Sequence, residues 1–168
     1  NTCFGTHHLM FAEDADNTLW TSGGGTAVGW LNTREFLETG DAVAAQGWTP
    51  FILDTNGNGR RDDYVEPDAN IDPSLDKRIS SGLYAVAPAP DGSVWGSNLS
   101  YPGAVVRVVP GADPSTTALT EYYELPLDEE GNAVEGFSPR GMDIDRNGIA
   151  WVALASGHMG RFDRSLCR

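Results

Sequence analysis

The chain has 168 residues, 40% of them hydrophobic, and its 24 acidic against 11 basic residues give a net charge of −13. This acidity argues against a nucleic-acid partner, since no basic stripe is available to displace counterions, and against docking on an anionic membrane. No apolar run approaches the roughly 20 residues of a membrane-spanning helix, so we expect no membrane insertion. Twenty glycines, ten prolines and five tryptophans are typical of an all-β domain rich in turns.

The chain begins with a predicted hairpin that has two histidines at its entry. Leu9 to Trp20 predicts two short strands around an Asp16-Asn17 turn, and Ala27 to Leu31 predicts a further apolar strand. Neutral imidazole suits a metal ligand or an acid–base group, so His7 and His8 are candidate site residues. The alternative is a strand entry at which one histidine packs and the other is solvated.

Residues 32–47 form the one segment with helical character. We expect Thr33 to cap a short helix that Gly40 ends. The preceding glycines, 23–25, lack the continuation of a phosphate-binding loop and are interpreted as a flexible connection.

The most specific local motif follows Phe51-Ile52-Leu53 and has the form D-x-N-x-N-G-x-x-D. Alternate oxygen-bearing side chains on a tightly turning loop can converge on one hard cation, and calcium takes about 6–8 oxygen ligands. The expected ligands are the side chains of Asp54, Asn56, Asn58 and Asp62 and the backbone carbonyl of Arg60. The alternative is an Asn/Gly-rich turn that holds itself by side-chain to backbone hydrogen bonds. The loop resembles the calcium loops of integrin-type and FG-GAP propeller repeats.

The first hairpin recurs twice downstream. Leu83 to Trp95 contains an Asp91-Gly92 turn, and Met142 to Trp151 contains an Asn147-Gly148 turn. Each copy continues into another apolar strand, so the three copies predict an antiparallel all-β fold of propeller-like repeats within one domain, 1–168.

The spacing of the tryptophans divides the domain further. The distance along the chain from Trp20 to Trp95 exceeds that from Trp95 to Trp151, which indicates an insertion in the first interval. We expect each tryptophan at an equivalent position, largely buried between neighbouring sheets. The expected repeats cover about 6–31, 82–126 and 137–163, with the calcium loop in an insertion over about 32–81.

The third copy resembles one step of a streptogramin lyase-like (virginiamycin B lyase-type) β-propeller. The residues that carry this resemblance are Leu125-Pro126, Pro139-Arg140-Gly141, Asn147-Gly148, Trp151 and Met159-Gly160-Arg161. It implies a partial β-propeller of about three blades, and because propellers typically have about 4–8 blades, the partners would be the rest of a propeller or other protein chains. The chain starts without Met or a signal peptide, which favours a mature or excised piece.

The lyases of this family use His and Glu near the channel together with magnesium. Here the family's Trp-x-x-Glu pattern is missing after Trp20, Trp95 and Trp151. His158 is the nearest candidate for a family-like catalytic histidine, but it lacks that acidic partner, so the sequence leaves enzymatic activity undecided.

Two functions of different classes therefore stay open, beside a purely structural role as part of a larger secreted protein. The first is a calcium-binding, extracellular or periplasmic propeller module that binds a protein, a small molecule or a polysaccharide. The second is a lyase- or hydrolase-type enzyme at the channel mouth. The strand-entry residues of the three repeats would form its acid–base and anion-holding set: His7, His8, Tyr84 and Arg140. Tyr84 and Arg140 are also the candidate ligand-binding residues.

Cys3 and Cys167 lie near the two ends of the chain. One interpretation is a disulfide that ties the termini together in an oxidising compartment. The other is two unrelated cysteines.

Overall fold

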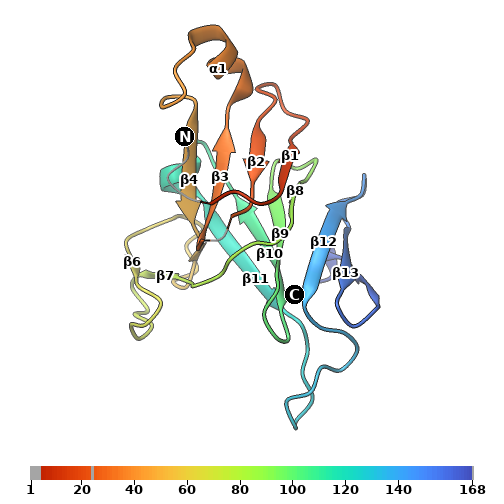
Figure 1. Ribbon diagram of the computed structural model, residues 1–168. Coiled ribbons are helices and arrows are strands. Elements are labelled where there is room, and N and C mark those ends of the chain that lie inside the picture. Colours follow the sequence, from red (N-terminus) through yellow and green to blue (C-terminus); the bar gives the residue numbers. More distant parts are fainter. Residues whose placement is uncertain (1–4, 24, 168) are drawn as a thin grey trace.

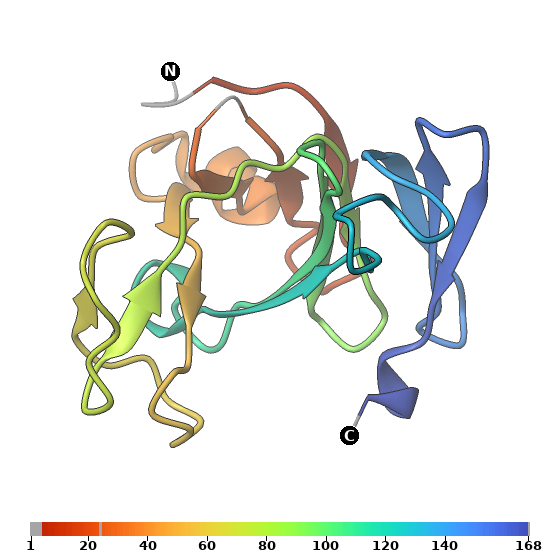
Figure 2. The ribbon, with the colours of Figure 1, turned by 90° about the horizontal axis from the view of Figure 1, so that it is seen from below.

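The computed structural model describes residues 5–23 and 25–167. Its regular structure is nearly all β and forms antiparallel meanders that follow one another along the chain (Figure 1 and Figure 2). We call the three meanders blades 1, 2 and 3. No helix in the described ranges is both long and apolar enough to span a bilayer.

Blade 1 is a four-stranded sheet in the order β1-β2-β3-β4. Its strands are β1 (Leu9–Phe11), β2 (Leu19–Thr21), β3 (Ala27–Leu31) and β4 (Gln46–Pro50). Strand β4 lies within the segment 32–81 that the sequence assigned to an insertion, because the chain returns from α1 to pair beside β3. The insertion proper therefore begins after Pro50.

Helix α1 (Thr33–Thr39) connects β3 to β4. Gly40 ends it with a φ of 72°, as the sequence predicts. The predicted cap is wrong by one residue, because the Asn32 side chain accepts the hydrogen bond from Glu35 N–H, while the Thr33 hydroxyl donates to the carbonyl of Asn17.

Blade 2 contains β8 (Val86–Pro88), β9 (Val94–Asn98), β10 (Ala104–Val109) and β11 (Leu119–Glu124), with α2 (Pro114–Thr117) before β11. The insertion adds β5 (Ile52–Leu53), β6 (Tyr64–Val65) and β7 (Asp76–Arg78) to the outer edge of this blade. Strand β5 pairs in parallel with β11, and the seven-stranded order is β6-β7-β5-β11-β10-β9-β8. The predicted calcium loop is thus attached to blade 2.

Blade 3 has three strands in the described part of the chain: β12 (Pro139–Ile144), β13 (Ala150–Leu154) and β14 (Met159–Phe162). A 3₁₀ helix, η1 (Arg164–Leu166), follows β14. Figure 2 shows blade 3, in blue, standing beside blade 2 at the side opposite the insertion.

The predicted hairpin turns are confirmed. Each is closed by a residue with positive φ: Asn17 at 50°, Gly92 at 82° and Gly148 at 76°. Asn and Gly tolerate this region at little steric cost. The strand reversals were therefore predictable from the sequence.

The core is divided between two blade interfaces. Between blades 1 and 2 it includes Trp20, Val28, Val94, Val106 and Val108. Between blades 2 and 3 it includes Ala85, Ala87, Trp95, Val105, Met142, Ala150 and Val152. Trp20 and Trp95 each fill the interface with the next blade. The predicted burial of the tryptophan is therefore confirmed in two of the three repeats.

The third tryptophan differs from this pattern. Trp20, Trp95 and Trp151 all lie in the second strand of their blade, so the predicted equivalence holds. Trp20 and Trp95 are 5% and 2% exposed, but Trp151 is 41% exposed. The predicted burial is wrong at Trp151, because no further sheet covers its face within the described chain.

A serine two residues after the tryptophan joins blade 1 to blade 2. The hydroxyl of Ser22 accepts a hydrogen bond from the His8 N–H (3.1 Å) and donates one to the Tyr84 carbonyl (2.7 Å). Ser22 is buried. One hydroxyl therefore holds the first-strand entries of two neighbouring blades together.

The same arrangement recurs between blades 2 and 3. The hydroxyl of Ser97 accepts from the Ala85 N–H (3.1 Å) and donates to the Arg140 carbonyl. Ser97 is likewise buried. The equivalent residue of blade 3 is Ala153, which has no hydroxyl and is exposed. We call this bridge the serine link.

Candidate functional site

The predicted calcium loop, 54–62, connects β5 to β6 at the edge of blade 2. The carboxylate of Asp54 accepts hydrogen bonds from the backbone N–H groups of Gly57 (2.7 Å), Asn58 (3.1 Å) and Gly59 (2.8 Å). Gly57 and Gly59 have φ values of 75° and 73°, which lets the chain turn sharply. The first residue of the motif thus organises the loop.

Three other predicted ligands converge within this loop. The side-chain amide nitrogens of Asn56 and Asn58 lie 3.0 Å and 2.5 Å from Oδ2 of Asp62. These two hydrogen bonds, with that of Asn58 the stronger influence, hold the pKa of Asp62 below its usual range. A rotated Asn amide presents its oxygen in place of its nitrogen, so the same side chains can face a cation.

Some contacts of the loop belong to the self-held turn that the sequence left as the alternative. The N–H of Arg60, the remaining predicted ligand, donates to Oδ1 of Asn58 (2.8 Å), which is a bond of a self-held turn. Within residues 5–23 and 25–167, no three or more His, Cys, Asp or Glu side chains gather as a metal cluster. A cation here would therefore rely on amide and backbone oxygens beside the carboxylates of Asp54 and Asp62.

Asp76 in β7 borders the loop and was not singled out from the sequence. It is 0% exposed, and its Oδ2 accepts a hydrogen bond from the Asp62 N–H (2.8 Å). Its Oδ1 is buried and has no hydrogen-bond partner within residues 5–23 and 25–167. Asp76 lies in the segment 32–81 that the sequence assigned to an insertion, and its burial depends on the pairing of β7 with β5 and β6.

The strand-entry residues form a second group, and the structure brings all four together. The ring centroids of His7 and His8 lie 4.3 Å apart, and those of His8 and Tyr84 lie 4.6 Å apart. The guanidinium of Arg140 lies over the Tyr84 ring at 5.8 Å. The serine links position this group, because they join the backbone beside His8 to Tyr84 and that beside Ala85 to Arg140.

This group contains acid–base and anion-binding side chains. Nε2 of His8 is buried and has no hydrogen-bond partner among the described residues, whereas His7 is exposed. His158 is not part of the group: it lies in the β13–β14 turn, where its Nδ1 is 3.0 Å from the hydroxyl of Ser156. Of the predicted catalytic candidates, His7, His8 and Arg140 thus lie in one group around Tyr84, whereas His158 lies apart from them.

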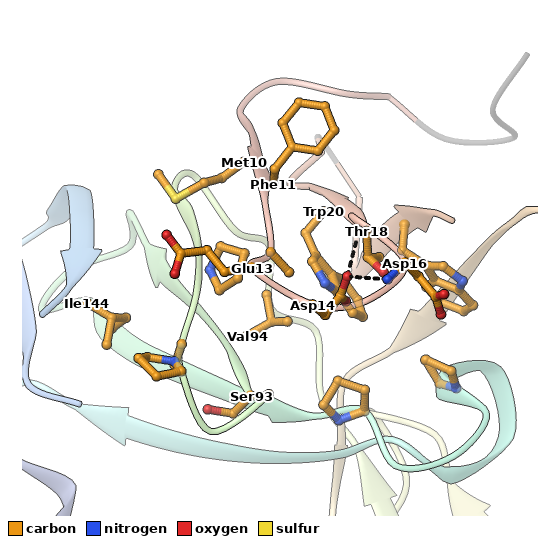
Figure 3. A pocket seen from close by; sticks show the side chains of 18 of the residues that line it. Met10, Phe11, Glu13, Asp14, Asp16, Thr18, Trp20, Ser93, Val94 and Ile144 are labelled. Carbon is orange, nitrogen blue, oxygen red and sulfur yellow. Dashed lines mark hydrogen bonds between the residues drawn. The ribbon is translucent and has the colours of Figure 1, made fainter. Parts of the chain in front are cut away.

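A pocket of about 730 Å³ lies at the opposite end of the strands, among the hairpin turns (Figure 3). Its lining comes from all three blades and includes five carboxylates and one arginine: Glu13, Asp14, Asp16, Asp143, Asp145 and Arg146. Aromatic and proline side chains, among them Trp20 and Trp30, complete it. In Figure 3 the Glu13 side chain extends into the space between β1 and Ile144.

Two of the pocket carboxylates are held by their own turns. Oδ1 of Asp14 accepts from the N–H groups of Asp16 (3.2 Å) and Thr18 (2.9 Å), as the dashed lines of Figure 3 show. Hydrogen bonds from the Trp151 indole and from the Ile149 N–H lower the pKa of Asp145. The sequence reasoning missed this pocket because it interpreted Asp16-Asn17 and Asn147-Gly148 only as hairpin turns.

Comparisons with known proteins bear on the fold. No family model and no curated protein matches the chain. Among solved structures, PorZ, an essential bacterial surface component of the type-IX secretion system of Porphyromonas gingivalis, has a TM-score of 0.53 and 17% identity. That match covers 93% of this chain and 18% of PorZ, so this chain spans less than a fifth of that protein.

Virginiamycin B lyase from Staphylococcus aureus is also similar, at a TM-score of 0.27 and 12% identity over 97% of this chain and 71% of the lyase. The likeness is too loose to carry an argument about family or activity. The match to PorZ shows the fold alone. The chain therefore has a β-propeller-like fold, and membership of the streptogramin lyase family stays a prediction.

Cys3 lies outside the described residues, and Cys167 is exposed. The disulfide between them stays a prediction.

Proposed function

We propose that this chain is a calcium-binding β-propeller module of an extracellular or periplasmic protein, and that it binds a protein or another ligand. The observation that carries the calcium proposal is the convergence of Asn56 and Asn58 on Asp62 in a loop organised by Asp54. The buried Oδ1 of Asp76, which has no partner in the described part of the chain, supports it, since such an oxygen beside the loop favours a nearby positive charge.

The ligand chemistry favours calcium over other metals. Carboxylate, amide and carbonyl oxygens on a flexible loop suit its irregular coordination, whereas magnesium demands near-octahedral geometry and dehydrates reluctantly. Zinc prefers Cys and His, and the loop 54–62 has neither. Two Asn residues in place of Asp lower the charge of the site, so we expect weaker binding than in an all-Asp loop.

The acidic pocket among the hairpin turns supports the proposal that the chain binds a ligand. It is acidic, lined by aromatic and proline side chains, and built by all three blades. These features favour a cationic ligand, such as a basic segment of another protein. An extracellular or periplasmic location is supported by the likeness in fold to a bacterial surface component.

Calorimetric titration with calcium and with magnesium tests the proposal. We expect one calcium ion per chain, weaker or no binding of magnesium, and a higher melting temperature in calcium. Asp54→Ala and Asp62→Ala should abolish the heat of binding and the thermal shift. Asp68→Ala is the matched control, because Asp68 is an exposed acidic residue of the same insertion outside the loop. Equal melting temperatures of the unchanged chain with calcium and with chelator would contradict calcium binding.

A second function is favoured by one observation, the contact between His7, His8, Tyr84 and Arg140. This set can supply acid–base chemistry and hold an anion, as a lyase- or hydrolase-type enzyme requires. Incubation with virginiamycin B and magnesium, followed by mass spectrometry, tests it with the substrate that the resemblance names. Ring opening that disappears in the His7→Ala/His8→Ala variant would support the enzyme; an intact substrate would favour the binding module.

A further inference from the structure

The first and last blades each have one sheet face that nothing covers within the described chain. On blade 3 this face contains Trp151 and Met159, which are 41% and 68% exposed. On blade 1 it contains Leu9, Phe11 and Trp48, which are 63%, 50% and 48% exposed. Exposed apolar patches of this kind mark interaction surfaces.

Strand register shows that the two faces are of opposite kinds. We call the face with the second-strand tryptophan the tryptophan face and its opposite the receiving face. Trp20 of blade 1 packs on the receiving face of blade 2, and Trp95 of blade 2 packs on that of blade 3, where its ring centroid lies 5.9 Å from that of Phe162. Within the described chain, blade 3 thus has a tryptophan face with no receiving face against it, and blade 1 has a receiving face with no tryptophan against it.

The residues of the three receiving faces correspond position by position. Pairing across the strands aligns Leu9, Leu19 and Leu31 of blade 1 with Val86, Val94 and Val108 of blade 2 and with Met142, Ala150 and Phe162 of blade 3. All nine are apolar. The receiving face of blade 1 therefore has the chemistry of the two that are already occupied inside the chain.

We propose that two copies of this chain associate head to tail, with the tryptophan face of blade 3 in one copy against the receiving face of blade 1 in the other. The contact continues the two blade interfaces of the chain. It is heterologous, and two such contacts close a ring of six blades, within the range of about 4–8 that propellers adopt.

One difference from the internal interfaces is built into the sequence. The position of the linking serine, Ser22 in blade 1 and Ser97 in blade 2, is occupied by Ala153 in blade 3. By the same alignment, the carbonyl that a serine there would reach is that of His7, in the position of the Tyr84 and Arg140 carbonyls. The contact between copies thus lacks a hydrogen bond that each internal interface has, so Ala153→Ser should tighten it.

Sedimentation velocity of the whole chain, from micromolar to millimolar concentration, tests the proposal. We expect a reversible shift from 18.0 kDa to twice that mass. Trp151→Glu and Leu9→Glu should each weaken dimer formation strongly. Leu37→Glu is the matched control, since Leu37 is 81% exposed on α1 and outside both faces, and it should dimerise like the unchanged chain.

A mixture of the two impaired variants identifies the heterologous contact. In a mixture, the intact Trp151 face of one variant can meet the intact Leu9 face of the other, so a dimer with one contact should reappear. Ala153→Ser should lower the dissociation constant about 2- to 12-fold for each contact, as one hydrogen bond allows. A chain that stays monomeric at millimolar concentration would overturn the proposal. So would dimers that Trp151→Glu disrupts and Leu9→Glu does not, or species that grow beyond the dimer.

Discussion

The serine link between blades 2 and 3 gives the most direct prediction about stability. Ser97→Ala removes the acceptor of the Ala85 N–H and the donor to the Arg140 carbonyl. The Ala85 N–H is buried, and an unpaired buried donor costs about 1–3 kcal/mol, while the lost hydrogen bond to Arg140 adds about 0.5–1.5 kcal/mol. We expect Ser97→Ala to lower the free energy of unfolding by about 2–4 kcal/mol.

Urea unfolding followed by tryptophan fluorescence measures this loss, because Trp95 lies at the same interface. The matched control is Ser74→Ala, whose hydroxyl bonds to Asp72 in an exposed turn, and which should change the stability by less than about 0.5 kcal/mol. If Ser97→Ala were as mild as Ser74→Ala, the serine link would not hold the blades together and the reasoning would be wrong.

Further predictions concern pH and backbone conformation. Burial alone would raise the pKa of Glu121, but hydrogen bonds, first that of Arg164, lower it to about 2. Its contribution to stability is therefore complete above about pH 4.5 and lost as the pH falls towards 2, and Glu121→Gln should flatten this part of a stability–pH curve. Gly103 and Gly131 both have positive φ, but only at Gly103 would a Cβ collide with Pro139. In thermal unfolding, Gly131→Ala should lower the free energy of unfolding by about 1–2 kcal/mol, and Gly103→Ala should lower it by at least about 3 kcal/mol. Equal losses of stability in the two variants would refute the packing argument.

Local patterns were enough to predict the repeat. Turn residues with positive φ, such as Asn17 and Gly148, and the tryptophan of each second strand placed the hairpins at equivalent positions. The grouping of His7 with Tyr84 followed from the same superposition. These features were predictable because hairpin chemistry depends on neighbouring residues.

Features that depend on long-range pairing were not predictable. No local pattern predicted that Gln46–Pro50 would complete blade 1 or that β5 would pair with β11, because those partners are distant along the chain. The burial of Asp76 depends on the same pairing. Trp151 illustrates the converse: its pattern matches that of the buried Trp95, but burial needs a neighbouring sheet that the described chain does not supply.

A high-resolution crystal structure of the chain grown in calcium-containing buffer tests the central claim most directly. The account predicts one ion in the loop 54–62, with oxygen ligands from Asp54, Asn56, Asn58, Asp62 and the Arg60 carbonyl at about 2.3–2.6 Å. The amides of Asn56 and Asn58 should then present oxygen, in place of the nitrogens that face Asp62 here. An ordered loop with only water at its centre would contradict the claim.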